Sequence, residues 1–211
     1  MAYLKLWADM HSNIHHGQID ELSLWLQHAQ ETMDFWPIAY YPFYMRKLEN
    51  GFAIEDLYDE EIYQEDWETI RMTCKQANEK GFAMFMGYEW QGNGSDGDHN
   101  VFFLNNDQPQ KHPMLYSELK ETYKGEPVIA IPHHLAYQLG SRGKNWDSHD
   151  ETFSPFAEIY SSHGLSEKDP AFLAMDRHVH MGPRVSNTAY ERGLERGQRA
   201  DKMVASDCAG I

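Results

Sequence analysis

The stretch FAMFMGYE, residues 82–89, decides the fold because it joins a long apolar run to a single carboxylate. A continuous apolar run of this length is typical of a parallel strand that is covered on both faces. A buried carboxylate is costly unless it has a partner, so Glu89 at the end of this run needs one. The stretch therefore predicts a buried strand that delivers Glu89 to a polar site.

Similar runs recur along the chain and alternate with helical patterns. Apolar residues at positions 22, 25, 26, 29 and 33 form one helical stripe, and a second stripe runs through residues 60–80. An Asp-Pro pair at 169–170 predicts the start of another helix, and Asn187 is a candidate cap for one that ends near Gly197. The further predicted strands are residues 3–8, 35–40, 128–131, 156–160 and 203–205, with 101–104 as a possible hairpin partner. This alternation predicts an α/β fold with a parallel sheet.

Composition indicates one globular domain that spans residues 1–211. The sequence has no internal repeat, no low-complexity tract and no linker-like segment. Its two cysteines, Cys74 and Cys208, fit a reducing compartment. No apolar run approaches the roughly 20 residues of a membrane helix, and the N-terminus lacks the features of a signal peptide. We therefore expect a cytoplasmic protein with no membrane partner.

The formal net charge of -15 restricts the possible partners. Proteins that bind nucleic acid neutralise phosphates with basic patches, and anionic lipid makes the same demand. The charge therefore argues against both, and we expect a small-molecule substrate.

A histidine or a carboxylate follows five of the predicted strands. In α/β folds the catalytic groups gather beyond the C-terminal ends of the strands, so these side chains are expected to meet in one site. They are Asp9 and His11, Glu89 with His99, His133 and His134, His163, and Asp207. This recurrence at strand ends is the strongest functional signal in the sequence.

Imidazole and carboxylate ligands together suit Zn, Mn or Fe, whereas a thiolate site would need more cysteine. Each candidate also has a structural alternative. Glu89 could form a buried ion pair, the His133–His134 doublet could be hydrogen-bonded in the core, and His163 could belong to a simple turn. Arg142 could grip an anionic substrate group or lie on the surface.

Several motifs together resemble one family. These are DMHSN at 9–13, GYEW at 87–90, HNVFF at 99–103, IPHH at 131–134, EIYSSHG at 158–164 and ASD at 205–207. In this order they resemble the polymerase and histidinol phosphatase (PHP) superfamily, and a bacterial branch related to carbaryl hydrolases in particular.

The resemblance implies a distorted (β/α)7 barrel with a cluster of up to three metals. It implies as ligands His11, Glu89, His133, His163 and Asp207, with Glu89 bridging. It also implies that Asp9 orients His11.

Departures from the family pattern lower the expected number of metals. Asn13 stands where the family has a second histidine, Tyr40 and Tyr41 replace an Asp-His pair, and Ala209 replaces a further histidine. We therefore expect one divalent cation per chain, at most two. The sequence also ends just after the last motif, which predicts a fold that is incomplete at the C-terminus. An apolar face left uncovered there would favour a homo-oligomer.

The sequence thus predicts a metal-dependent hydrolase that uses metal-bound hydroxide. Its substrate would be a small phosphoester, a carboxylic ester or a carbamate, with His134 or His99 as the acid for the leaving group. Two alternatives remain: a metal-binding or ligand-binding protein that has lost catalysis, and a metal-dependent carbohydrate lyase.

Overall fold

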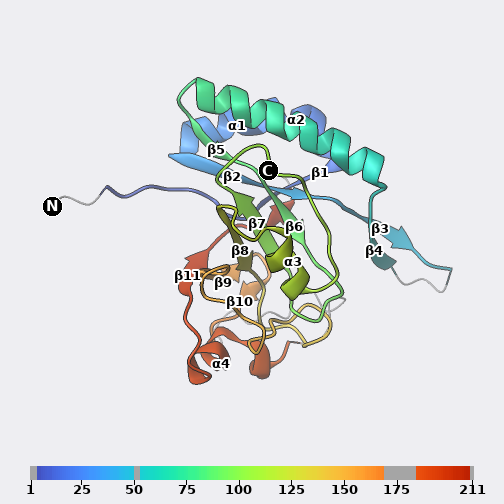
Figure 1. Ribbon diagram of the computed structural model, residues 1–211, viewed down its shortest axis with the longest axis vertical. Coiled ribbons are helices and arrows are strands. Elements are labelled where there is room, and N and C mark those ends of the chain that lie inside the picture. Colours follow the sequence, from blue (N-terminus) through green and yellow to red (C-terminus); the bar gives the residue numbers. More distant parts are fainter. Residues whose placement is uncertain (1–3, 50–52, 169–183, 210–211) are drawn as a thin grey trace.

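The computed structural model describes residues 4–49, 53–168 and 184–209. Its largest unit is a seven-stranded sheet with the order β12-β1-β2-β6-β7-β8, in which β5 also pairs with β2 (Figure 1). The strands are β1 (Ser12–His15), β2 (Phe35–Tyr41), β5 (Ala83–Phe85), β6 (Gly87–Trp90), β7 (His99–Phe103), β8 (Val128–Pro132) and β12 (Cys208–Ala209).

The strand directions bring the C-terminal ends of β6 and β8 to one edge of this sheet. Strands β12, β1, β2 and β6 run parallel, whereas β7 is antiparallel to both β6 and β8. Strand β8 therefore runs in the same direction as β6. The ladder pairs Trp90 with His99 and His99 with Pro132, so the end of β6, the start of β7 and the end of β8 share an edge.

A second, three-stranded sheet lies beside β8. In it β9 (Phe156–Ser161) pairs with β10 (Gly164–Leu165) and, in parallel, with β11 (Asp201–Val204). The described strands form separate sheets and do not close into the expected (β/α)7 barrel. The antiparallel β7 is one reason, because it joins β6 to β8 directly where a barrel would need a helical crossover.

Two helices pack together over the main sheet (Figure 1). They are α1 (Leu22–Thr32) and α2 (Glu60–Glu79). The buried face of α2 contains Trp67, Ile70 and Cys74, which belong to the same core cluster as Trp36 and Tyr88. The predicted stripe of α2 is thereby confirmed. None of the described helices is both long and apolar enough to cross a bilayer.

The remaining elements are short. A hairpin of β3 (Phe43–Lys47) and β4 (Ala53–Leu57) projects from the body of the protein (Figure 1). The others are η1 (His16–Glu21), α3 (Tyr116–Thr122), η3 (Ser186–Thr188) and α4 (Tyr190–Glu195). Helix α4 lies at the opposite end of the molecule from α1 and α2 (Figure 1).

Most predicted strands are confirmed, with two changes. Residues 35–40, 101–104, 128–131 and 156–160 correspond to β2, β7, β8 and β9, and residues 203–205 overlap β11. The run at 82–88 is divided into β5 and β6 at Met86. The strand predicted at residues 3–8 is wrong for its described part, because residues 4–8 form no strand and β1 begins at Ser12. Leu4 and Trp7 are largely exposed, so this apolar run has no core to pack against.

Two helix predictions have different outcomes. Asn187 does not cap a helix: it lies in the short turn η3, and α4 begins at Tyr190 with Ala189 as its N-cap. The helix predicted from residues 169–170 lies outside the described residues.

The homo-oligomer also stays a prediction. An apolar groove of about 370 Å³ is open to solvent, lined by residues that include Phe35, Phe85 and Ile129.

A glycine allows β6 and β7 to approach closely. A Cβ at Gly87 would collide with the Phe102 ring and lie 2.7 Å from the Val101 carbonyl oxygen. We expect Gly87→Ala to lower the free energy of unfolding by about 1–3 kcal/mol, because neither neighbour can move without disturbing the ladder. Urea unfolding measures this change. Gly17→Ala is the matched control, since a Cβ there meets nothing within 4 Å; equal effects of the two substitutions would contradict the prediction.

Candidate metal centre

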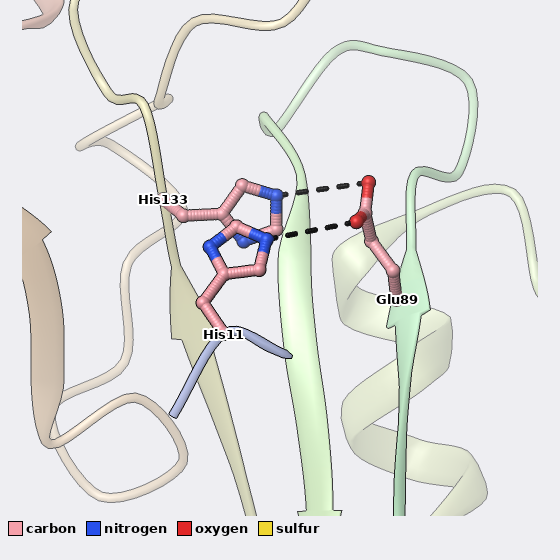
Figure 2. A group of neighbouring side chains, drawn as sticks. All are labelled: His11, Glu89 and His133. Carbon is pink, nitrogen blue, oxygen red and sulfur yellow. Dashed lines mark ion pairs between the residues drawn. The ribbon is translucent and has the colours of Figure 1, made fainter. Parts of the chain in front are cut away.

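The buried carboxylate of Glu89 faces two imidazole rings, which lie next to each other on the same side of it (Figure 2). His11 Nε2 lies 3.7 Å from Glu89 Oε2, and His133 Nε2 lies 3.7 Å from Glu89 Oε1. The two rings are 4.2 Å apart between centroids. One ligand atom from each of the three residues lies within 4.8 Å of the others, so this group can hold a metal ion.

Three segments far apart in sequence supply this group. Glu89 lies in β6, and His133 directly follows β8, so these two meet at the shared sheet edge as predicted. His11 instead directly precedes β1, and therefore does not reach the cluster from the end of a strand. His11 therefore joins the group as predicted, but the strand predicted at residues 3–8, which was expected to place it, is absent from its described part.

A second carboxylate holds the His11 ring. His11 Nδ1 lies 2.6 Å from Glu158 Oε2, inside the protein. This bond favours a proton on Nδ1 and turns Nε2 toward Glu89 and Asp207, whose Oδ1 lies 3.3 Å away. The resemblance implied that Asp9 orients His11, but Asp9 accepts the backbone N–H groups of His11, at 3.0 Å, and of Ser206, at 3.3 Å, and the ring of His11 is held by Glu158 instead. Glu158 therefore orients the ring.

His133 shows most clearly that the group suits a cation. Its side chain is fully buried, and neither ring nitrogen has a hydrogen-bond partner. Buried polar atoms are rarely left in this state, and an unplaced ion is one of the standard explanations. Two imidazoles and one carboxylate are also a donor set that zinc and related cations accept.

A neighbouring group consists of His134, His163 and Asp207. His163 Nε2 lies 3.1 Å from Asp207 Oδ2, and its Nδ1 lies 2.7 Å from the Tyr137 hydroxyl. Among the described residues, His134 and Asp207 are the two non-glycine residues with positive φ, at 33° and 47°. Such backbone conformations are uncommon and tend to occur at functional sites.

Two carboxylates that belong to these groups are not among the residues predicted from the sequence. Glu158 forms a group with His11 and Asp207, and Asp98 forms one with His133 and His134. Glu158 lies inside the apolar strand β9, which is the signal that had identified Glu89. Asp98 comes just before β7 in a polar loop, where no such contrast marks it.

The predicted catalytic residues lie around the cluster with different surroundings. Arg142 contacts Asp98 at 2.6 Å and also pairs with Glu55 of the hairpin, so its partly buried guanidinium is held by two carboxylates. His99 is enclosed: its Nδ1 lies 2.9 Å from the Gly97 carbonyl oxygen and its Nε2 lies 3.2 Å from Lys144 Nζ. Because Nδ1 of His99 faces a carbonyl oxygen, its Nε2 can accept a hydrogen bond from Lys144. Burial lowers the pKa of Lys144 to about 7.

The residues that replace expected ligands have other partners. Asn13 donates a hydrogen bond to Glu89 Oε2 at 2.9 Å. The hydroxyl of Tyr40 donates to Asp66 at 2.5 Å, and that of Tyr41 donates to Glu55 at 2.6 Å. These tyrosine hydroxyls are therefore held by carboxylates outside the groups that could hold a metal.

Charge in the cluster shifts two pKa values in opposite directions. Burial lowers the pKa of His11, but the carboxylates of Asp207 and Glu158 outweigh burial and hold this pKa well above its ordinary value. Burial raises the pKa of Glu89, but His11 and His133 outweigh it and hold this pKa well below its ordinary value. The metal-free cluster thus contains a carboxylate that stays ionised and a histidine that tends to be protonated.

His134 behaves differently from His11. Burial lowers its pKa well below the ordinary value, and the neighbouring His133 and His163 lower it further. A neutral imidazole is the form that binds a metal. His134 is therefore ready to act as a ligand near neutral pH.

No protein-family model matches the chain, and no curated protein matches it. It is similar to a solved two-domain protein from Bacteroides vulgatus ATCC 8482 that contains a predicted PHP-like metal-dependent phosphoesterase. The identity is 16%, the TM-score is 0.45, and the match covers 77% of this chain and 46% of that chain. The chain thus spans less than half of that protein's length, and a likeness at this level does not place it in a family.

The raised pKa of His11 predicts how the stability of the metal-free protein depends on pH. A raised pKa contributes stability that is fully present below about pH 6.5, the unfolded value, and is lost as the pH rises through the folded value. With a chelator present, we expect the melting temperature to fall as the pH rises above 6.5. His11→Gln should flatten this part of the profile, whereas His28→Gln, at an exposed site, should not. Parallel profiles for the wild type and His11→Gln would contradict the assignment.

Proposed function

We propose that this protein is a metal-dependent hydrolase that holds a divalent cation between His11, Glu89 and His133. The observation that carries the proposal is the set of buried ring nitrogens without hydrogen-bond partners, His11 Nε2 and both nitrogens of His133, next to an ionised carboxylate. Zn, Mn or Fe would suit this donor set. A bound cation of this kind lowers the pKa of water and polarises an ester oxygen.

The protein's own residues hold the ligands in place for this task. Glu158 fixes the tautomer of His11, so that its Nε2 is available. Tyr137 holds Nδ1 of His163 and thereby directs Nε2 toward Asp207. We place a second cation at His134, His163 and Asp207, which makes two per chain at most.

The proposed substrate is a small phosphoester, or a carboxylic ester or carbamate. Arg142 supports an anionic substrate group, because its guanidinium lies near the cluster beside Asp98. His134 would protonate the leaving group only if a bound substrate raised its lowered pKa, and His99 is disfavoured as the acid. The reason is that both ring nitrogens of His99 already have partners.

One observation favours a second candidate, a metal-binding protein without hydrolytic activity. Asn13 and Tyr40 stand where the resembled family has ligands, and their side chains are engaged with Glu89 and Asp66 instead. A protein with fewer ligands could keep a cation and lose turnover. Metal content and turnover must therefore be measured on the same sample.

Glu89→Gln tests the proposal. We expect it to remove most of the metal after reconstitution with Zn²⁺ or Mn²⁺, because the amide cannot supply the anionic ligand, and to lower hydrolysis by orders of magnitude. Elemental analysis gives the metal content, and a screen of aryl phosphates, aryl esters and aryl carbamates gives the activity.

Asp66→Asn is the matched control, since Asp66 is an equally buried carboxylate outside the groups that could hold a metal. Metal bound without turnover on any of these substrates would favour the metal-binding alternative. No metal in the reconstituted wild type would overturn the proposal.

A further inference from the structure

We propose that Asn13 and Gln91 are positioning residues that together hold the Glu89 carboxylate, with one of its oxygens directed to each histidine. This inference rests on the proposed function, because it assigns a task to two residues beside the same cation site. We call the pair of side-chain amides the amide clamp.

The geometry of the clamp matches the two oxygens of Glu89 one by one. Asn13 Nδ2 donates to Oε2 at 2.9 Å, and Gln91 Nε2 donates to Oε1 at 3.2 Å. The same Oε2 faces His11 Nε2, and the same Oε1 faces His133 Nε2, each at 3.7 Å. Each oxygen therefore has one amide donor and one imidazole beside it.

The orientation of both amides follows from their partners. An ionised carboxylate only accepts hydrogen bonds, so the nitrogen of each amide, and not its oxygen, must face Glu89. Gln91 Nε2 also donates to the Tyr41 hydroxyl at 3.1 Å, and that hydroxyl donates onward to Glu55. Because the Tyr41 proton is used on Glu55, its oxygen is free to accept from Gln91. A flipped Gln91 amide would lose both bonds.

Amide donors suit this task because they are neutral. Each carboxylate oxygen has two lone-pair directions, and one amide bond leaves the other direction for a cation. A lysine or arginine in the same place would orient Glu89 as well but would cancel the negative charge that attracts the metal. The clamp thus fixes the direction of the ligand and preserves its charge, and groups that orient ligands in this way contribute strongly to metal affinity.

The test is the dissociation constant for Zn²⁺, measured by competition with a chromogenic chelator. We expect Asn13→Ala and Gln91→Ala each to weaken zinc binding about 10- to 100-fold. In a Glu89→Gln background the same substitutions should change the constant by no more than about twofold, because their effect passes through the carboxylate. Crystal structures of the metal-free variants should show the Glu89 carboxylate turned away from its wild-type direction.

Two substitutions control for general damage. Gln108→Ala removes another hydrogen bond between a glutamine and a glutamate, to Glu126 at 2.8 Å on the surface. Asn78→Ala removes an asparagine near the end of α2, whose amide donates to the backbone carbonyls of Cys74 and Met84. Both should retain wild-type zinc affinity.

The outcomes separate the clamp from the proposed function. A wild-type protein that binds zinc, with Asn13→Ala and Gln91→Ala binding it equally well, overturns the clamp alone. Equal losses with and without Glu89, or an unmoved Glu89 carboxylate in the variants, also overturn it. A wild-type protein that binds no zinc overturns both the clamp and the proposed function.

Discussion

The negative charge of Glu89, buried inside the protein, is the constraint on which the rest of the site depends. An ionised carboxylate away from water is unfavourable unless other groups supply hydrogen bonds or positive charge. Here two amides donate to it and two imidazoles face it. Three further carboxylates, Asp98, Glu158 and Asp207, lie close by, and Arg142 contacts one of them. The carboxylates of Asp207 and Glu158 favour a protonated His11 in the metal-free state and a cation otherwise.

Both sheets contribute residues to the site. The main sheet brings Glu89 and His133 together, because β6 and β8 run in the same direction on either side of β7. The second sheet supplies Glu158 from β9, and His163 lies two residues after the end of that strand. Asp207 comes after β11 and before β12, the strand that returns to pair with β1 beside His11. The cluster therefore stands where the two sheets meet, and its geometry depends on how they pack.

Residues at the edge of the site link it to the outer parts of the structure. Gln91 and Tyr41 connect Glu89 to Glu55, which lies on the projecting hairpin and pairs with Arg142. On the other side of β2, the Tyr40 hydroxyl shares Asp66 of α2 with His16. Adjacent residues of β2 point to opposite faces, so Tyr40 contacts the helix layer while Tyr41 contacts Gln91 at the site. Neither phenol needs to be a metal ligand to have a defined role.

The sequence by itself determined most of the buried strands and several of the polar side chains that lie at or near their ends. Continuous apolar runs predict β2, β8 and β9, and the contrast between such a run and one carboxylate identifies Glu89, because desolvation of a charge is costly wherever the chain folds. The tertiary structure decided the rest. The place of β1, the antiparallel direction of β7 and the separate second sheet depend on pairing between distant segments, which local periodicity does not encode. For the same reason Glu158 rather than Asp9 orients His11, and Asn13 donates a hydrogen bond to Glu89. The first of these bonds joins residues that are 147 positions apart in the sequence and the second joins residues that are 76 positions apart, so both form only once the sheets have packed.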